Sequence, residues 1–313
     1  MSEPEVSVVI PTRNRETRLR FGLEALAAQT LDRSRFEIIV VRAEDTDKPW
    51  CDAPEGLEVR FITAPKGPAL QRNIGWRAAR GRLVAFTDDD CRATPQWLEN
   101  LLAAEGGPDD MLQGRTAPDP TELHLLHGRA RSIDIDAMDA WFPTCNIAFP
   151  RALLERLGGF DEDFPTAWGE DTDLGLRAID AGGTVFYVPE ALSYHAVNAR
   201  TLRQALREAW KRDSLPMVFA RHPRQRRALF MDTFVRRTHA NFLLALAGVV
   251  ILRRHPLLGL LAMLPYLRNR RPPLLALRSA PQILIHLPAR IAVDATEVAA
   301  VGRAAIRARV PVI

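Results

Sequence analysis

The first 90 residues alternate short, β-branched apolar runs with stretches of helical periodicity. The runs are VSVVI at 6–10, FEIIVV at 36–41, LEVRFI at 57–62 and LVAFT at 83–87. Between them, residues 16–29 repeat leucine and alanine on one helical face, and residues 68–80 begin with a proline, which helices accept at their first position. Strands that alternate with helices form sheets with parallel strands. The pattern predicts an α/β domain with a mostly parallel central sheet flanked by helices.

Charge divides the chain near residue 200. Residues 1–196 hold 21 Lys and Arg against 33 Asp and Glu, whereas residues 197–313 hold 21 against 5. An acidic first part is compatible with a metal-binding site, and a basic, apolar second part favours an anionic surface such as lipid headgroups or nucleic acid. We therefore expect one domain over residues 1–200 and a basic helical region over 201–313.

Length and cysteine usage bound the class of protein. A chain of 313 residues with 47% hydrophobic content can bury a substantial core. Cys51, Cys91 and Cys145 lie far apart, and the acidic N-terminus MSEPEVSVVIP does not read as a signal peptide. We expect reduced, mostly structural cysteines in a cytosolic chain.

Three consecutive carboxylates, Asp88 to Asp90, follow the apolar run that ends at Thr87. Unit charges a few Å apart repel by roughly one kcal/mol in water and by several near a protein surface, so a nearby cation is expected. A divalent metal at the carboxyl end of a strand would supply it, and a solvated acidic turn is the alternative. Thr94 and Pro95 predict the start of the next helix, so the acids are not needed as its cap.

The segments after the four runs are PTRNR, RAEDTD, TAPKG and DDD, and none is glycine-rich. Ligands of such sheets bind beyond the carboxyl ends of the strands. A dinucleotide fingerprint or a P-loop needs closely spaced glycines after the first strand. The sequence therefore argues against NAD binding and P-loop ATP hydrolysis. Any phosphate groups of a ligand are expected to be bound by a metal and by side chains.

Three ordered segments resemble the family 2 glycosyltransferases: VSVVIPTRNR, GPALQRNIGWRAARGRLVAFTDDD and GGFDEDFPTAWGEDTDLGLRA. The resemblance spans roughly residues 5–196 and rests on several motifs at sensible spacing. It implies a GT-A nucleotide-diphospho-sugar transferase fold for residues 1–200, a nucleotide-diphosphate sugar donor, and inversion at the anomeric carbon.

On the donor side, the resemblance places Asp88 and Asp90 on the family's DxD motif. It implies that Asp90 binds a divalent cation, Mn²⁺ or Mg²⁺, and that Asp88 contacts ribose or metal, which leaves Asp89 as the most dispensable of the three. His195 falls where many relatives place a third metal ligand, and imidazole suits Mn²⁺ better than Mg²⁺. Such a cation stabilises the charge that develops on a diphosphate leaving group.

The resemblance also implies nucleotide contacts from two other segments. Pro11, Thr12 and Asn14 match the loop that lies against the nucleotide, and Arg72 with Asn73 match a pair near the base and phosphates. Each residue alone is more often ordinary turn or helix chemistry, whereas together at strand ends they favour binding. The loop at 42–47 departs from the family, so either Asp45 or Asp47 contacts the base or ribose, or the loop is only a solvated acidic segment.

Residues 168–177, WGEDTDLGLR, match the family's acceptor-side motif. The resemblance implies that Asp171 is the base that deprotonates the attacking hydroxyl, and that Glu170 and Trp168 contact the acceptor. Core packing is the alternative for Trp168. We interpret Asp173 and Arg177 as a helical i, i+4 ion pair. His124 and His127 are spaced like a metal pair but have no role in the family, so we interpret them as surface residues.

After residue 200 the sequence predicts helices. TLRQALREAW is amphipathic, and two apolar stretches, one ending at 252 and one starting at 256, flank Arg253, Arg254 and His255. About thirteen helical residues rise roughly 20 Å, too little to cross about 30 Å of hydrocarbon. We expect a hairpin that lies in one leaflet of an anionic membrane, with a soluble helical bundle as the alternative. Nucleic acid is the weaker partner, because aromatic residues are not interleaved with the arginines.

Together these expectations describe an inverting, metal-assisted glycosyltransferase at the cytoplasmic side of the cell membrane, acting on a lipid-linked or cell-envelope glycan acceptor. The location becomes simply cytoplasmic if the last helices form a soluble bundle. One alternative is a nucleotidyltransferase of related fold, for which PTRNR is only partly suitable. The other is a membrane-bound scaffold with a degenerate sugar-nucleotide site.

Overall fold

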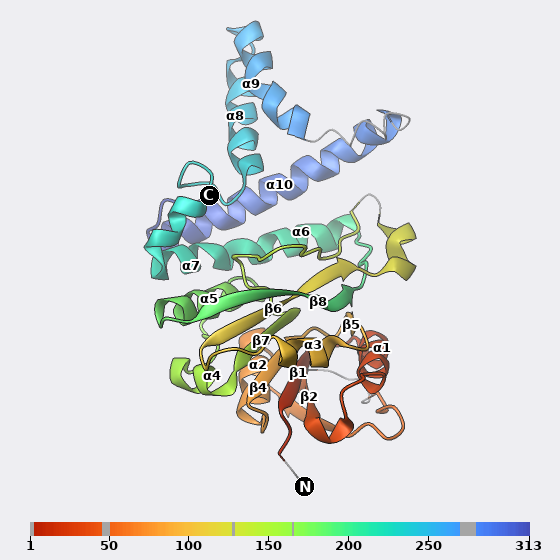
Figure 1. Ribbon diagram of the computed structural model, residues 1–313. Coiled ribbons are helices and arrows are strands. Elements are labelled where there is room, and N and C mark those ends of the chain that lie inside the picture. Colours follow the sequence, from red (N-terminus) through yellow and green to blue (C-terminus); the bar gives the residue numbers. More distant parts are fainter. Residues whose placement is uncertain (1–2, 46–50, 127–128, 165, 270–279) are drawn as a thin grey trace. The chain divides into compact units, whose positions relative to one another are not determined.

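The computed structural model describes residues 3–45, 51–126, 129–164, 166–269 and 280–313 (Figure 1). The chain divides into two compact units, Met1–Ala199 and Arg200–Ile313. The division falls where the charge of the sequence changes sign. Each unit contains buried hydrophobic clusters of its own.

An eight-stranded sheet forms the centre of the first unit, in the order β3-β2-β1-β4-β7-β6-β8-β5. Its strands are β1 (Val6–Thr12), β2 (Phe36–Ala43), β3 (Val59–Ala64), β4 (Leu83–Thr87), β5 (Cys91–Ala93), β6 (Asp110–Pro118), β7 (Asn146–Pro150) and β8 (Thr184–His195). Strands β1 to β4 pair in parallel, as do β6 and β8. By contrast, β7 is antiparallel to both β4 and β6, and β5 is antiparallel to β8.

The sheet is therefore mixed, which corrects the expectation of a mostly parallel sheet. That expectation holds for β1 to β4 and fails beyond β4. The reason is that β7 is buried along its whole length, as β4 is. A strand that is buried on both faces is a continuous apolar run in the sequence, whether it pairs in parallel or antiparallel. Its composition therefore does not reveal its direction in the sheet.

Helices pack around this sheet: α1 (Glu16–Ala27), α2 (Pro68–Arg77), α3 (Trp97–Ala103), α4 (Arg151–Leu157) and α5 (Glu170–Asp180). Short 3₁₀ turns are η1 (Arg33–Arg35) and η2 (Pro120–Leu125). The helices expected at 16–29 and 68–80 are confirmed as α1 and α2. The expected helix start at Thr94 is wrong, because Thr94 donates from its backbone N–H and its hydroxyl to the carbonyl of Leu192. Helix α3 begins at Trp97 instead.

The second unit is helical. It contains α6 (Leu202–Trp210), η3 (Lys211–Ser214), α7 (Leu215–Arg221), η4 (Pro223–Ala228), α8 (Arg237–Ile251), α9 (Pro256–Asn269) and α10 (Ala280–Ala308). Thr201 and Gln204 form a capping box that starts the amphipathic helix α6. Among the described residues, every helix is too short or too polar to cross a bilayer.

Helices α8 and α9 form a hairpin that extends away from α10 (Figure 1). The two backbones approach closely at Gly248 and Gly259, because a Cβ at either glycine would lie 2.7–2.8 Å from the carbonyl oxygen of the other. Much of the hairpin's apolar side-chain surface is exposed, at Leu244, Leu246, Val249, Val250, Ile251, Leu257, Leu258, Leu260, Leu261, Leu264 and Leu267.

Buried carboxylates of α10 hold the base of the hairpin. Glu297 pairs with Arg212 of η3 and with the Nε2 atom of His239 on α8. Tyr266 of α9 donates its hydroxyl to Asp294 at 2.6 Å. These pairs use two of the five acidic residues of residues 197–313 to bind the hairpin into the unit.

Candidate active site

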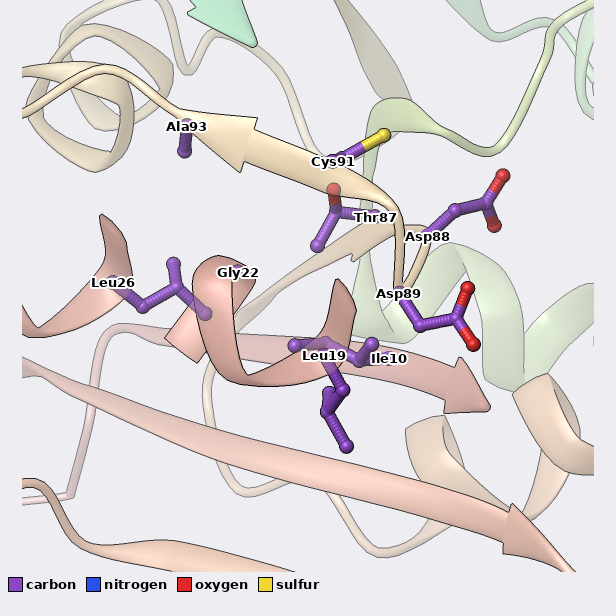
Figure 2. Close-up of a pocket in the computed structure, with 9 residues that line it drawn as sticks. All are labelled: Ile10, Leu19, Gly22, Leu26, Thr87, Asp88, Asp89, Cys91 and Ala93. Atoms are coloured by element: carbon purple, nitrogen blue, oxygen red, sulfur yellow. The ribbon is translucent and has the colours of Figure 1, made fainter. Parts of the chain in front are cut away.

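The three carboxylates lie in the tight turn between β4 and β5. The backbone N–H of Cys91 donates to the carbonyl of Asp88 and closes this turn. Asp89 and Asp90 are buried, whereas the side chain of Asp88 is 28% exposed. Figure 2 shows the carboxylates of Asp88 and Asp89 leaving the turn on the same side. The acidic turn is therefore part of the packed domain and not a solvated loop.

Below the turn, Figure 2 also shows a small pocket between α1 and β5. Its lining is largely apolar, with Ile10, Leu19 and Leu26 on one side. Thr87, Asp88 and Asp89 also line it, so the pocket lies directly against the acidic turn.

An arginine of the chain itself neutralises part of the acidic turn. Arg15 donates to Asp89 at 3.1 Å and to Asp90 at 2.8 Å. The side chain of Arg15 is 48% exposed, so its guanidinium lies at the rim of the site. Sequence reasoning missed Arg15, although its place in PTRNR, one residue after Asn14, was the available signal.

The dispensability expected of Asp89 stays a prediction, and the contacts of this carboxylate argue against it. It is 5% exposed, accepts a hydrogen bond from the Thr12 hydroxyl at 2.7 Å, and pairs with Arg15. Burial raises the pKa of Asp89 above its ordinary value, although Arg15 opposes the shift. Asp89 therefore ties the end of β1 to the turn, and we expect its replacement by alanine to destabilise the site.

Asp90 and His195 face each other across the β5–β8 pair. The Oδ1 atom of Asp90 lies 3.5 Å from Nε2 of His195, and its Oδ2 atom accepts from Asn198 at 3.0 Å and from Arg15. On His195, Nδ1 lies 2.8 Å from the carbonyl oxygen of Ala196, which only accepts, so Nδ1 carries the proton. Nε2 therefore faces Asp90 and is the ring atom that would bind a metal placed between the two side chains.

Cys91 completes a group of possible ligands. One ligand atom each from Asp90, Cys91 and His195 lies within 4.8 Å of the others. Carboxylate, thiol and imidazole are all metal-binding groups, so this donor set could hold a divalent cation. Sequence reasoning selected Asp90 and His195 and missed Cys91.

Arg72 bridges the donor-side and acceptor-side carboxylates. It is buried on α2 and donates from Nη1 to Glu170 at 2.9 Å and from Nη2 to Asp88 at 3.2 Å. Sequence reasoning placed Arg72 near the base and phosphates. In the structure its guanidinium contacts two carboxylates of the chain, so it links the DDD turn to the start of α5.

Asn73, on the same helix, supports the segment that precedes the WGED motif. Its Oδ1 atom accepts from the Phe160 backbone at 2.8 Å and from Trp76 at 2.9 Å. Its Nδ2 atom donates to the Phe160 carbonyl and to Glu162. Since Asn73 is fully buried and its amide is engaged on both sides, the chain supplies all its partners. The nucleotide contact expected of Asn73 stays a prediction.

The acceptor-side motif forms the first turn of α5. Gly169 precedes the helix with φ 105°, a left-handed conformation that glycine adopts without a Cβ clash. Acidic residues suit this end of a helix because the macrodipole is positive there. The expected Asp173–Arg177 ion pair is confirmed at 2.8 Å.

Glu170 and Asp171 have shifted proton affinities. Burial raises the pKa of Asp171 to about 6, against the opposing charge of Arg72. Burial and then the neighbouring charge of Asp171 raise the pKa of Glu170, again against Arg72. The Oδ1 atom of Asp171 accepts from the backbone N–H of Thr172 at 2.8 Å. The Oε2 atom of Glu170 is buried without a hydrogen-bond partner in the described part of the chain.

The other predicted residues lie at the ends of strands or near α5. Pro11 and Thr12 end β1, and Asn14 follows with φ 58°, a conformation that asparagine tolerates. Trp168 is half-buried next to Gly169, and its stacking on a sugar stays a prediction.

The loops after β1 and β2 are joined by an ion pair. Arg13 donates to both oxygens of Asp45, at 2.9 and 2.7 Å. Asp45 thus already has a cationic partner, whereas Asp47 lies outside the described residues. His124 is exposed on η2, as expected, and His127 lies outside the described residues.

Comparison with known proteins places this site in a family. The chain matches the families described as "Glycosyl transferase family 2" over residues 7–154 and "Glycosyl transferase family group 2" over residues 84–289. It is 30% identical over 240 residues to a validoxylamine A glucosyltransferase of Streptomyces hygroscopicus subsp. limoneus, covering 63% of this chain and 53% of that one. It is also 30% identical over 243 residues to the pre-mycofactocin glycosyltransferase of Mycobacterium tuberculosis, covering 71% and 49%. The chain thus spans about half the length of these curated relatives.

Two solved structures share the fold. The mannosyltransferase PcManGT from Pyrobaculum calidifontis, in complex with GDP-Man and Mn²⁺, superposes with a TM-score of 0.55 at 22% identity, over 97% of this chain and 88% of that one. TarS 1–349 of S. aureus, in complex with UDP-GlcNAc, gives 0.52 at 14% identity, over 98% and 92%. The chain has the α/β fold with a mixed sheet of GT-A transferases, and it belongs to the family 2 glycosyltransferases.

Proposed function

We propose that this glycosyltransferase inverts the anomeric carbon as it moves a sugar from a nucleotide diphosphate to a hydroxyl acceptor, with the help of a divalent cation. The observation that carries the proposal is the bridge made by Arg72, which contacts Asp88 on the donor side and Glu170 beside Asp171 on the acceptor side. A single displacement needs a leaving-group stabiliser and a base held in one fixed arrangement. The bridge supplies that arrangement.

On the donor side, Asp90 and His195 would hold the cation, with Asp88 beside them. When bound, a divalent cation stabilises negative charge on the leaving diphosphate. Arg15 adds a half-exposed guanidinium at the same turn, suited to a phosphate oxygen. Pro11, Thr12 and Asn14 would lie against the nucleotide. The mannosyltransferase of the same fold, in complex with GDP-Man and Mn²⁺, supports a nucleotide-sugar donor and a divalent cation here.

On the acceptor side, Asp171 would accept the proton of the attacking hydroxyl. Its half-buried carboxyl has a pKa of about 6, so it is unprotonated near neutral pH and still basic enough to accept a proton. Glu170, held by Arg72, fixes the start of α5 next to it. Trp168 would offer an aromatic face to a sugar ring.

The test incubates the full chain with a panel of nucleotide sugars, Mn²⁺ or Mg²⁺, and lipid-linked or glycan acceptors. We expect release of nucleoside diphosphate, and a product whose anomeric configuration, read by NMR, is opposite to that of the donor. Pyrophosphate release would point to nucleotidyl transfer. If calorimetry detects no binding of any sugar nucleotide in the presence of metal, the result would favour the alternative hypothesis of a membrane-bound scaffold with a degenerate site.

The metal ligands are tested by replacing Asp90 with asparagine and His195 with alanine. We expect each change to weaken Mn²⁺ binding at least about tenfold, because each removes a donor atom. Calorimetric Mn²⁺ titration measures the effect, and His124→Ala, an exposed histidine, is the control. Unchanged Mn²⁺ affinity in both site variants would show that the cation does not bind at the DDD turn.

For the second unit we propose peripheral binding to the cytoplasmic face of an anionic membrane through the α8–α9 hairpin. Val250 is 80% exposed and Leu257 is 76% exposed, a degree of apolar exposure that water does not favour. The exposed Arg253, Arg254 and His255 join the two helices, and arginines attract anionic headgroups. A lipid-linked acceptor would then share the surface on which the enzyme lies.

Vesicle flotation tests this surface. The full chain should float with vesicles rich in anionic lipid, and Leu257→Asp with Leu261→Asp should abolish flotation, because carboxylates do not enter an apolar interface. Leu123→Asp, at an exposed leucine of the first unit, should float like the unchanged chain. If the hairpin variant floats as well as the unchanged chain, the exposed leucines do not bind the membrane, and they would instead pack in a helical bundle or against another partner.

A further inference from the structure

We propose that Cys91 is a third protein ligand beside Asp90 and His195, and that the site therefore binds thiophilic divalent cations such as Zn²⁺ and Co²⁺ more tightly than Mn²⁺ or Mg²⁺. This inference rests on the proposed metal site and adds a residue and a cation class to it. Neither the DxD motif nor its histidine implies a sulfur ligand.

Strand pairing brings the three residues together. Cys91 and His195 are direct partners in the antiparallel β5–β8 ladder. Side chains of directly opposite residues lie on the same face, with Cβ atoms about 4.5–5.5 Å apart. Asp90 precedes Cys91, and its carbonyl accepts from the Ala196 backbone N–H at 2.9 Å, which extends the ladder past the ligands. The backbone thus holds all three residues, and their ligand atoms lie within 4.8 Å of one another.

Neighbouring groups orient two of the ligands towards a common point. The Ala196 carbonyl accepts a hydrogen bond from Nδ1 of His195 and leaves Nε2 as the atom that faces the metal. Asn198 and Arg15 occupy Oδ2 of Asp90 and leave Oδ1 facing Nε2. Helix α1 fixes the backbone of Cys91 from below, because Gly22 lets it approach the Cys91 carbonyl, where a Cβ would be 3.0 Å away. Partners of this kind strengthen metal binding.

The chemistry of the donor set decides the preferred cation. Zn²⁺ binds sulfur, imidazole and carboxylate in four-coordinate sites, whereas Mg²⁺ and Mn²⁺ favour oxygen ligands. Cys91 forms no disulfide, so its sulfur is a buried thiol, and metal binding would have to offset the burial that raises the pKa of this thiol. On binding, the thiol proton leaves to solvent as the metal–sulfur bond forms. Zn²⁺ should therefore displace Mn²⁺ and inhibit Mn²⁺-supported transfer, because a cysteine sulfur would hold Zn²⁺ more tightly than Mn²⁺.

Cobalt spectroscopy on the full chain tests the sulfur ligand directly. With Co²⁺ bound, we expect a sulfur-to-cobalt charge-transfer band in the near ultraviolet. Cys91→Ser should lose this band, weaken Zn²⁺ binding at least about tenfold, and leave Mn²⁺ affinity within about twofold. Cys145→Ser, at the second cysteine of the same buried cluster, is the matched control and should keep the band.

The outcomes separate this inference from the proposed function. Bound Co²⁺ without a charge-transfer band in the unchanged chain overturns the role of Cys91 and leaves the Asp90–His195 site standing. A band that survives Cys91→Ser overturns it as well. Failure of Co²⁺, Zn²⁺ and Mn²⁺ to bind at all overturns the metal-assisted function itself. Should Cys91→Ser fail to fold, the spectrum of the unchanged chain and the proton released on Zn²⁺ binding still decide.

Discussion

Replacement of Asp171 by asparagine is expected to lower kcat by about 10²- to 10⁴-fold, the usual contribution of a general base. Asparagine keeps the size of the side chain and can still accept from the Thr172 N–H, but it cannot take a proton from the acceptor hydroxyl. Donor binding should stay within about threefold, since loss of the base leaves the nucleotide contacts intact. Steady-state release of nucleoside diphosphate and calorimetric donor binding measure the two effects.

The pH profile gives the same prediction a second readout. The base works only when it is unprotonated, and burial raises the pKa of Asp171 to about 6. We therefore expect kcat to fall as the pH drops below about 6 and to level off above it. Asp180→Asn, at the exposed far end of α5, is the control and should keep both the rate and the profile. If Asp171→Asn retains kcat within tenfold, the base is another residue.

Replacement of Arg72 by methionine is expected to abolish transfer and, above about pH 8, to destabilise the fold by about 3–5 kcal/mol, because it leaves the ionised Glu170 carboxylate buried without a cation. The side chains of Arg72 and Glu170 are 6% and 2% exposed, so water cannot replace the lost partner. Activity is lost as well, because Asp88 and Glu170 no longer share one cation. Urea unfolding measures the free energy, and the diphosphate-release assay measures activity.

The pH dependence of this loss follows from Glu170. With Arg72 present, burial already raises its pKa from 4.5 to about 8, and without the opposing guanidinium the shift increases. A carboxyl whose pKa is higher in the folded than in the unfolded chain binds more protons when folded. Stability of the variant should therefore fall as the pH rises from about 4.5 through 8.

A double variant separates charge burial from positioning. Arg72→Met with Glu170→Gln removes the unpaired carboxylate and should recover most of the lost free energy of unfolding, since the two changes are coupled. It should remain inactive, because Arg72 then no longer links Asp88 to the start of α5. Full activity in the double variant would show that the bridge is dispensable for catalysis, and unchanged stability of Arg72→Met would show that the pair contributes little to folding.

The sequence by itself determined the α/β class, helices α1 and α2, the β1–β4 half of the sheet and the family. Periodicity and strand-end polarity are local properties, so they can be read from neighbouring residues. Family motifs are also local: the DDD turn and the WGED segment each lie within a few residues. The Asp173–Arg177 pair, four residues apart on one helix, was predictable for the same reason.

Tertiary structure alone decided the arrangement of charges. Several features of the site depend on contacts between segments that are distant in sequence. They are the direction of β7, the burial of Asp89, the ion pairs of Arg15, the bridge made by Arg72 and the pairing of Cys91 with His195. Such contacts depend on strand register and on which neighbours a side chain meets, and a one-residue change of register would turn Cys91 away from His195. The three carboxylates are visible in the sequence, whereas their partners are set by the fold.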